Sequence, residues 1–333
     1  MAGSGFEGFE KRLELHFSGD DPLGLRRLSF KALDCVLAAV QCTVVSAVGN
    51  AFFDAYVLSE SSLFLYPAKL VIKTCGTTGL LHSVPLLLSH AAGLGLQLLR
   101  CKYTHGSFIF PRTQPPPHCS FNEEVVFLDS NLPASLRHRK ARVLPSHSLR
   151  HKWHVYSASS TVDYPVEDDN PVTVEVCMTE LDRTVAGRFF LCPENAGMSG
   201  HEAGQEMTRR ASIAATAAPQ AFICDFAFDP CGYSMNGLQA DRYSTIHVTP
   251  EEGYSYASYE CVVANKSEIQ SVLEKVNAVF RPGVMSVSVT GGHAVWIEIA
   301  GGLRCRSRAA DAFPGAGTVT YQTFAAGMDE WSA

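Results

Sequence analysis

Residues 56–66 read YVLSESSLFLY, an apolar run with a polar centre. The tyrosine, valine, leucine and phenylalanine residues favour β-structure, so the stretch predicts a buried strand over residues 55–66. Its centre, however, is SESS (59–62), and polar side chains are uncommon at core positions. Three hydroxyls and a carboxylate inside an apolar run therefore indicate a role beyond packing, which the surrounding sequence has to explain.

The composition is that of a folded, mildly acidic protein. The 333 residues are 46% hydrophobic and 18% charged, with a formal net charge of -6. This is enough for one large core or two modest ones, and the negative balance argues against a protein that binds nucleic acid over its whole surface. The start, MAGSGFEGFEKRLEL, predicts no secretory signal. The most apolar stretch, 80–99, contains His82, Pro85 and His90, which favours an amphipathic helix over a membrane span.

The eleven cysteines favour a reducing compartment. No CxxC pair occurs, and the cysteine spacings match neither zinc sites nor disulfide scaffolds. We therefore expect most of them to be small buried residues of a cytosolic protein, with no metal site and no membrane or nucleic-acid partner.

Outward from residues 55–66, the hydrophobic pattern predicts many strands and few helices. A helix is expected over 29–40, with Ser29 as its N-cap, and strands over 42–48 and 69–75. Further strands are predicted at 107–110, 153–157, 172–178, 222–228, 243–248, 255–263, 284–290 and 294–299, and further helices at 203–217 and 266–280. The order shows no regular βαβ alternation and no fixed-period repeat. It therefore favours an α+β fold with antiparallel sheets.

The segment 130–162 is strongly basic and contains no acidic residue. Between 137 and 152 it carries Arg137, Arg139, Lys140, Arg142, Arg150 and Lys152, with His138, His147 and His151. Such a run is typical either of a patch that binds nucleic acid or an anionic surface, or of a solvated surface loop. The proline and serine content and the acidic chain as a whole favour the loop.

Three short stretches place chemically versatile side chains at strand ends or turns. KTCGTT (73–78) sets Cys75 before a glycine turn, DPCGYSMNG (229–237) predicts a tight turn around Ser234, and STIHVTPEE (244–252) sets His247 in a strand. GYSMNG has one residue too many for the GxSxG nucleophile motif. Taken singly, these residues are a packed thiol, a turn hydroxyl and a core histidine. Taken together, they leave open a thiol enzyme that pairs Cys75 with His247.

Five segments resemble the signature stretches of the eukaryotic S-adenosylmethionine decarboxylases, in the same order and at similar spacings. They are FEGFEKRLE (6–14), YVLSESSLF (56–64), KTCGTT (73–78), DPCGYSMNG (229–237) and STIHVTPEEGYSYASYE (244–260). KWHVYSAS (152–159) resembles the plant-type branch. The resemblance implies one decarboxylase domain over 1–333, built as a four-layer αββα sandwich of two mainly antiparallel β-sheets flanked by helices.

The resemblance also implies an answer to the polar centre of the first stretch. The Ser61 hydroxyl would attack the Glu60 carbonyl, and the chain would cleave itself into a small chain, 1–60, and a large chain, 61–333. Ser61 would end as a pyruvoyl group, a covalent pyruvate cofactor that forms a Schiff base with the substrate. The implied reaction converts S-adenosylmethionine to decarboxylated S-adenosylmethionine and CO2 for spermidine and spermine synthesis.

The matched positions imply roles for individual residues. Cys75 would protonate the substrate carbon, and Glu7 and Glu10 would lie in or near the active site. In processing, Ser234 would hold the tetrahedral intermediate and His247 would remove the proton whose loss drives elimination. Substrate binding would involve Phe6 and Phe228 on the two faces of the adenine, the Glu60 backbone at its edge, and Glu251 at the ribose hydroxyls.

Diamine-activated relatives bind putrescine in a buried acidic cluster, to which Glu14, Glu175 and Glu260 correspond. This chain has Pro171 where those relatives have an aspartate, and Arg12 lies beside the cluster. We therefore expect an internal activator pocket and activity independent of putrescine. Two questions stay open: whether the two-chain unit is a monomer or a homodimer, and whether the chain is instead a non-catalytic paralogue that binds a nucleoside or regulates an active decarboxylase.

Overall fold

The computed structural model describes residues 6–145, 151–161, 171–195, 197–218, 220–299 and 302–326. The first half of the chain forms an eight-stranded sheet, sheet A, and the second half forms another, sheet B. Sheet A contains β1 (Lys11–Ser18), β2 (Val44–Gly49), β3 (Asp54–Leu58), β4 (Ser61–Leu65), β5 (Lys69–Thr74), β6 (Gln97–Gly106), β7 (His138–Leu144) and β8 (Trp153–Ser159). Sheet B contains β9 (Val172–Leu181), β10 (Phe222–Ala227), β11 (Tyr233–Gln239), β12 (Arg242–Thr249), β13 (Tyr256–Val263), β14 (Pro282–Gly291), β15 (Leu303–Phe313) and β16 (Gly317–Ala326).

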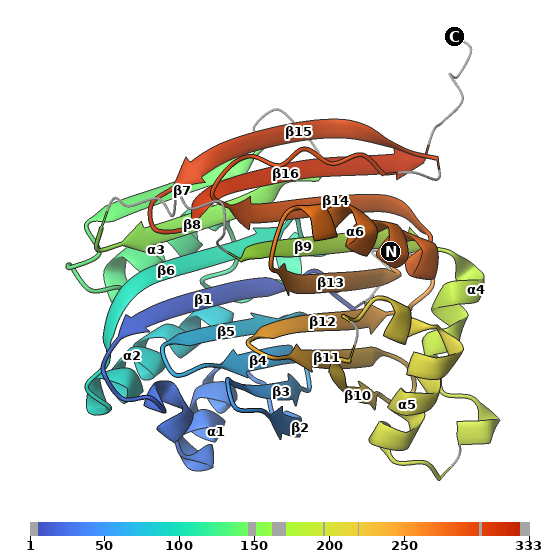
Figure 1. The fold of residues 1–333 in the computed structure, drawn as a ribbon, viewed down its shortest axis with the longest axis horizontal. Helices are drawn as coiled ribbons and strands as arrows, with labels where there is room; N and C mark the ends of the chain where they lie inside the picture. Colours follow the sequence, from blue (N-terminus) through green and yellow to red (C-terminus); the bar gives the residue numbers. More distant parts are fainter. Residues whose placement is uncertain are drawn as a thin grey trace.

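Helices cover the outer face of each sheet. The α-helices are α1 (Phe30–Ala39), α2 (Ser83–Gly93), α3 (Phe121–Asn131), α4 (Arg183–Ala186), α5 (Gly200–Arg210) and α6 (Ser267–Phe280). Short 3-10 turns occur at Gly24–Arg27, Leu80–His82, Pro111–Thr113, Gly187–Phe189, Pro193–Asn195 and Ile213–Ala215. Apolar residues of α1, α2 and α3 share one core with sheet A, and those of α4, α5 and α6 share another with sheet B. The strands of the two sheets run in similar directions (Figure 1), and the expected αββα sandwich is confirmed.

The two sheets have the same strand order, although no repeat is visible in the sequence. Sheet A runs β2-β3-β4-β5-β1-β6-β8-β7, and sheet B runs β10-β11-β12-β13-β9-β14-β16-β15. Each strand of sheet B therefore occupies the place of the strand numbered eight lower in sheet A, and all pairings are antiparallel. The duplication lies in the topology, because strand pairing requires only a suitable pattern and not particular residues.

The layer between the sheets is apolar at its ends and polar in its centre. One apolar cluster joins β3, β4 and β5 to β11 and β12, with the rings of Phe64 and Tyr243 stacked 4.1 Å apart. The other joins β7 and β8 to β15 and β16, with Trp153 and Tyr321 stacked at 5.7 Å. The charged side chains described below lie between these clusters, shielded from water on both sides.

Residues 55–66 do not form the single strand that was predicted for them. It is a hairpin in which β3 ends at Leu58, β4 begins at Ser61, and Ser59 and Glu60 form the turn. The loop Ser59–Glu60 has none of the Asn-Gly, Asp-Gly or Gly-X pairs that mark a two-residue hairpin in a sequence, so only its polar side chains hinted at a turn.

Other predictions fail where side chains replace strand partners. Residues 107–110 and 294–299 are irregular. In the second of these, the N–H of Ile297 donates to the Gln322 side chain, whose amide donates back to the Ile297 carbonyl. The basic segment is not one surface loop, because it contains β7 and β8. In β7, Lys140 and Arg142 both pair with Asp311 of β15, while residues 146–150 lie outside the described ranges.

The predicted elements elsewhere are close to those observed. Ser29 caps α1, as expected, by accepting a hydrogen bond from the Ala32 N–H. The helix predicted over 203–217 is α5, which ends at Arg210 and is followed by a 3-10 turn. No helix in the described part of the chain is long and apolar enough to cross a membrane.

The apolar cluster between the sheets predicts that two phenylalanines differ greatly in how much their loss destabilises the fold. Phe64 is fully buried against Tyr243, whereas Phe30 is 60% exposed at the start of α1. Phe64→Ala is expected to lower the free energy of unfolding by about 3–5 kcal/mol, because it leaves a cavity between the sheets. Phe30→Ala is expected to change it by no more than about 0.5 kcal/mol. Urea unfolding followed by circular dichroism measures both, and equal losses would contradict this packing.

Candidate active site

Ser61 has a backbone conformation that L-residues rarely adopt. Its φ is 146°, in a region used almost only by glycine, and holding a serine there costs on the order of 1–3 kcal/mol. Leu63 and Leu65 of the same strand pack into the helix-facing core, and strict alternation would send Ser61 the same way. The hydroxyl instead donates to Glu10 Oε1 at 2.5 Å, on the side facing sheet B. Pairing with Leu58 and Thr74 holds the residue in this strained state.

The carbonyl that precedes Ser61 is held by Cys75. The Glu60 carbonyl oxygen accepts hydrogen bonds from the Cys75 backbone N–H at 2.9 Å and from its thiol at 3.0 Å. Cys75 reaches this position because β5 ends at Thr74 and the chain turns at Gly76, whose φ is +63°. A Cβ at Gly76 would lie 3.2 Å from both the Glu60 carboxylate and the Phe6 ring, so the turn favours glycine.

Glu10 links the Ser61 hydroxyl to sheet B. Its carboxylate lies 3.2 Å from Lys73 Nζ and 3.6 Å from His247 Nε2. Burial raises the pKa of a carboxyl, but the Lys73 ammonium and the hydroxyl groups of Ser258 and Ser61 outweigh it and hold the pKa of Glu10 below its usual value. Glu10 is therefore a charged acceptor that already holds the Ser61 proton in a hydrogen bond.

His247 lies in β12 among neutral hydroxyl groups. Its Nδ1 is 2.8 Å from Ser234 Oγ, and its Nε2 is 2.9 Å from Thr245 Oγ1 and 3.3 Å from Ser62 Oγ. Burial is the main cause that lowers the pKa of His247 to about 4. The ring is therefore neutral at physiological pH and free to take up a proton.

Ser234 was expected in a tight turn, which is wrong. It lies within β11, directly opposite His247 in the β11–β12 ladder. This pairing is the reason the two side chains meet, since opposite residues in an antiparallel ladder point to the same face. Among the described hydrogen bonds, the Glu60 carbonyl is bound by Cys75 and not by Ser234. The sequence did not suggest that the Cys75 backbone N–H would bind the Glu60 carbonyl oxygen.

Cys75 has the environment of a proton donor rather than of a nucleophile. Burial and the carboxyls of Glu60 and Glu10 raise the pKa of its thiol well above the usual value. The side chain therefore stays protonated at neutral pH. Within the described residues, the thiol contacts the Glu60 carbonyl and carboxylate, and no hydrogen bond joins it to His247. The geometry gives no support to a thiol–imidazole pair.

A cavity of about 340 Å³ opens beside these groups, between the two sheets. Its walls are Phe6, Ser59, Glu60, Ser61 and Cys75 from the first half of the chain, and residues 228–234, 247–249 and 251 from the second. The predicted residues Phe6, Phe228 and Glu251 thus share one cavity with Ser61. The Glu251 carboxylate also accepts the Phe6 backbone N–H at 2.8 Å, which ties the start of the described chain to sheet B.

Glu7, which was predicted to lie in or near the active site, does not line this cavity. Its carboxylate accepts the backbone N–H groups of Phe9 at 3.0 Å and Phe110 at 2.7 Å. Burial raises its pKa, and those hydrogen bonds only partly oppose the effect. Its own carbonyl accepts the Gly76 N–H at 2.8 Å. Glu7 therefore supports the turn that carries Cys75.

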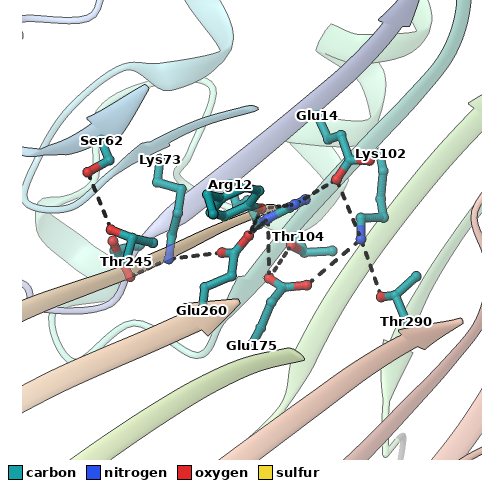
Figure 2. Close-up of polar contacts among 12 residues, drawn as sticks. Arg12, Glu14, Ser62, Lys73, Lys102, Thr104, Glu175, Thr245, Glu260 and Thr290 are labelled. Carbon is teal, nitrogen blue, oxygen red and sulfur yellow. Dashed lines mark hydrogen bonds and ion pairs between the residues drawn. The ribbon is translucent and has the colours of Figure 1, made fainter. Parts of the chain in front are cut away.

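The predicted activator residues meet in the polar centre between the sheets (Figure 2). Arg12 donates to Glu260 at 2.8 Å and to Glu14 at 2.6 Å, and lies 3.8 Å from Glu175. Tyr243 also binds Glu260. Arg12, Glu175 and Glu260 are almost entirely buried, and the Glu14 side chain is 15% exposed. Buried carboxylates require such partners because desolvation is costly.

Two lysines in this network were not predicted. Lys73 Nζ lies 3.0 Å from Glu260, so it connects the network to Glu10 and Ser61. Lys102 Nζ lies 3.9 Å from both Glu14 and Glu175, as Figure 2 shows. Each lysine interrupts a mainly apolar strand. That interruption was the sequence feature that could have indicated a buried charge at these positions. No group of His, Cys, Asp and Glu able to hold a metal ion occurs among the residues described.

Comparisons with known proteins identify the family of the chain. Residues 3–325 match the family model described as adenosylmethionine decarboxylase. The chain is 53% identical to S-adenosylmethionine decarboxylase proenzyme 4 of Arabidopsis thaliana, over 97% of this chain and 99% of that protein. It is 43% identical to the S-adenosylmethionine decarboxylase proenzyme of Oryza sativa subsp. japonica, over 98% of this chain and 83% of the relative.

A solved structure shows the same fold at low identity. The Trypanosoma brucei AdoMetDC-delta26 monomer superposes with a TM-score of 0.59 at 22% identity, covering 80% of this chain and 99% of that one. The family model spans nearly the whole chain, and the plant relatives match it from end to end. The chain belongs to the adenosylmethionine decarboxylase family.

Proposed function

We propose that this protein is a self-processing decarboxylase that converts S-adenosylmethionine to its decarboxylated form for polyamine synthesis. The observation that carries the proposal is the Glu60–Ser61 bond. A strained serine donates its hydroxyl to a carboxylate, while the carbonyl before it is polarised by two donors. We also propose that the protein acts in the cytosol, because none of its eleven cysteines forms a disulfide.

The first step of processing is attack by Ser61 Oγ on the Glu60 carbonyl carbon. Glu10 takes the hydroxyl proton, and the Cys75 N–H and thiol stabilise the negative charge that develops on the carbonyl oxygen. The C–N bond then breaks, the amine takes a proton, and an ester joins Glu60 to the Ser61 side chain. Release of the strained φ of Ser61 favours this step over reversal.

The second step removes the ester. His247, neutral at physiological pH, takes the α-proton of residue 61, and the Glu60 carboxylate leaves from the β-carbon. Water then adds to the resulting dehydroalanine and ammonia departs, which leaves a ketone at the start of the large chain. The hydrogen bond between Ser234 Oγ and His247 Nδ1 fixes the orientation of the His247 ring during the proton transfer.

The two chains remain one folded unit after the cut. Residues 1–60 supply β1, β2 and β3, and β1 is hydrogen-bonded between β5 and β6 of the large chain. Separation would break two ladders and expose the apolar residues of β1, so the chains stay associated.

The surroundings of residue 61 fit a pyruvoyl group, since the residue opens into the cavity beside a proton donor. Such a group supplies the electrophilic carbonyl that accepts the electron pair released with CO2. Phe6 and Phe228 hold the adenine between their rings, with the Glu60 backbone at its edge, and the free oxygen of Glu251 accepts from the ribose. The thiol of Cys75 donates the proton that replaces the lost carboxylate.

The buried network takes the place of a diamine activator. Arg12 and Lys102 supply positive charge to Glu14, Glu175 and Glu260 from within the chain. Through Lys73, the same network holds Glu10 against Ser61 without an added ligand.

Intact-mass measurement tests the proposed processing. The purified wild-type protein is expected to consist of two chains separated between residues 60 and 61, the larger with a pyruvoyl terminus. Ser61→Ala is expected to stay one chain, because no hydroxyl is available for attack. Ser59→Ala, in the same turn, is expected to be cut like the wild type. A wild-type protein that persists as one chain would instead support the non-catalytic paralogue.

The pH dependence of processing tests the role of His247. Since the pKa of His247 is lowered to about 4, its neutral form persists at pH 6 and is lost only as the pH falls towards 4. The rate of chain cleavage, followed on denaturing gels after refolding, is therefore expected to be flat between pH 8 and pH 6. A decline centred near the ordinary histidine value of about 6.5 would rule out a buried, neutral His247 as the base.

Added putrescine is expected to leave the decarboxylation rate unchanged, because Arg12 and Lys102 already neutralise the acidic cluster. In Arg12→Ala, the carboxylates lose their nearest cation, and this variant is expected to be slower and to recover activity with putrescine. Release of labelled CO2 measures both. A several-fold stimulation of the wild type would contradict internal activation.

A further inference from the structure

Lys11 is a buried ammonium that the proposed reaction does not use. It is fully buried at the start of β1. Leu13 and Leu15, two and four residues further on, pack into the helix-facing core, so alternation places Lys11 on that face and Arg12 on the other. A charged group on this apolar face loses its hydration, which is costly unless the charge has a function or close partners.

The partners of Lys11 are neutral and belong to the Cys75 turn. Its Nζ donates to the Gly76 carbonyl at 3.1 Å and to Gln114 Oε1 at 2.7 Å, and lies 5.1 Å from the centre of the Phe108 ring. Within the described residues, no carboxylate lies within ion-pair distance of Nζ. The charge of Lys11 is therefore not cancelled by direct contact, and it acts on groups further away.

The Cys75 thiol is the group most in need of that charge. After it donates its proton to the substrate carbon, the thiol becomes a buried thiolate with the carboxyls of Glu60 and Glu10 nearby. Both carboxyls disfavour the anion, and Lys11 is the cation that opposes them. Burial lowers the pKa of Lys11 to about 8, so the side chain is still mostly charged at pH 7.

We propose that Lys11 is a positioning residue for Cys75, which fixes the 75–76 turn and stabilises the thiolate formed on proton donation. The proton passes from sulfur to the substrate carbon, the electron pair stays on sulfur beside the Lys11 ammonium, and solvent water later returns a proton to the thiolate. This inference rests on the proposed role of Cys75 as proton donor. The effect of Lys11 on the acidity of the Cys75 thiol, however, can be measured without substrate.

Lys11→Gln tests the proposal, because glutamine keeps an N–H donor for the Gly76 carbonyl and removes the charge. The probe is iodoacetamide, which reacts with the thiolate, and peptide mass spectrometry reads the alkylation rate of Cys75 from pH 6 to 7.5, where Lys11 is charged in the wild type. The exposed Cys35 in the same sample is the internal standard. We expect the apparent pKa of Cys75 to rise by at least about one unit, so that alkylation at a fixed pH slows about tenfold or more.

Two further variants separate charge from packing. Lys11→Arg keeps the charge and is expected to retain a profile near that of the wild type. Gln114→Leu removes a partner of the ammonium but not its charge, and is expected to leave the Cys75 profile in place. Lys11→Met, whose apolar side chain suits the helix-facing core, is the second neutral variant should Lys11→Gln not fold. Thermal denaturation confirms that each compared variant is folded.

The outcomes distinguish this inference from the proposed function. An unchanged Cys75 profile in a folded neutral variant overturns the role of Lys11, whether or not the protein decarboxylates its substrate. Conversely, a shifted profile in a protein that releases no CO2 would support Lys11 and reject the proposed reaction. Where the wild type is active, the neutral variants are expected to lose kcat with little change in KM, and Lys11→Arg is expected to restore it.

Discussion

The rest of the structure depends on the compensation of buried charge between the two sheets. Glu10, Lys73, Glu260 and Arg12 form a chain of ion pairs that crosses from one sheet to the other. In a layer shielded from water, a displaced partner would leave an uncompensated charge, so the sheets have one favourable register. That register brings Ser61 of the first sheet to His247 of the second, and it determines the position of the cavity between them.

The same layer allows a strained peptide to persist. Ser61 lies next to β3 on one side and β5 on the other, and its hydroxyl is bound by a carboxylate that is itself held by Lys73. The ladders and the ion pair together offset a local backbone cost of a few kcal/mol. Stability is thus used to hold one bond in a reactive geometry, which fits the self-cleavage proposed for it.

The duplicated topology explains how one cavity draws on both halves of the chain. The β3–β4 and β11–β12 hairpins occupy equivalent places in the two sheets, and they face each other across the interface. One hairpin contributes the bond proposed to break, and the other contributes Ser234 and His247. Equivalent backbone positions therefore carry different side chains, so the duplication is evident in the strand order and not in the sequence.

The sequence by itself determined the fold class, through strands without βαβ alternation, and most of the candidate site, through five short segments that include Glu60, Ser61, Cys75, Ser234 and His247. Segments of this kind are readable because their residue types and spacing are local. Only the tertiary structure decided that residues 55–66 form a hairpin, that Ser61 is strained, and that Lys73 and Lys102 join the buried network while Lys11 contacts the turn after Cys75. The reason is that hydrophobic periodicity reports which side chains avoid water, whereas strain and charge compensation depend on partners far apart in the chain, such as Arg12 and Glu260.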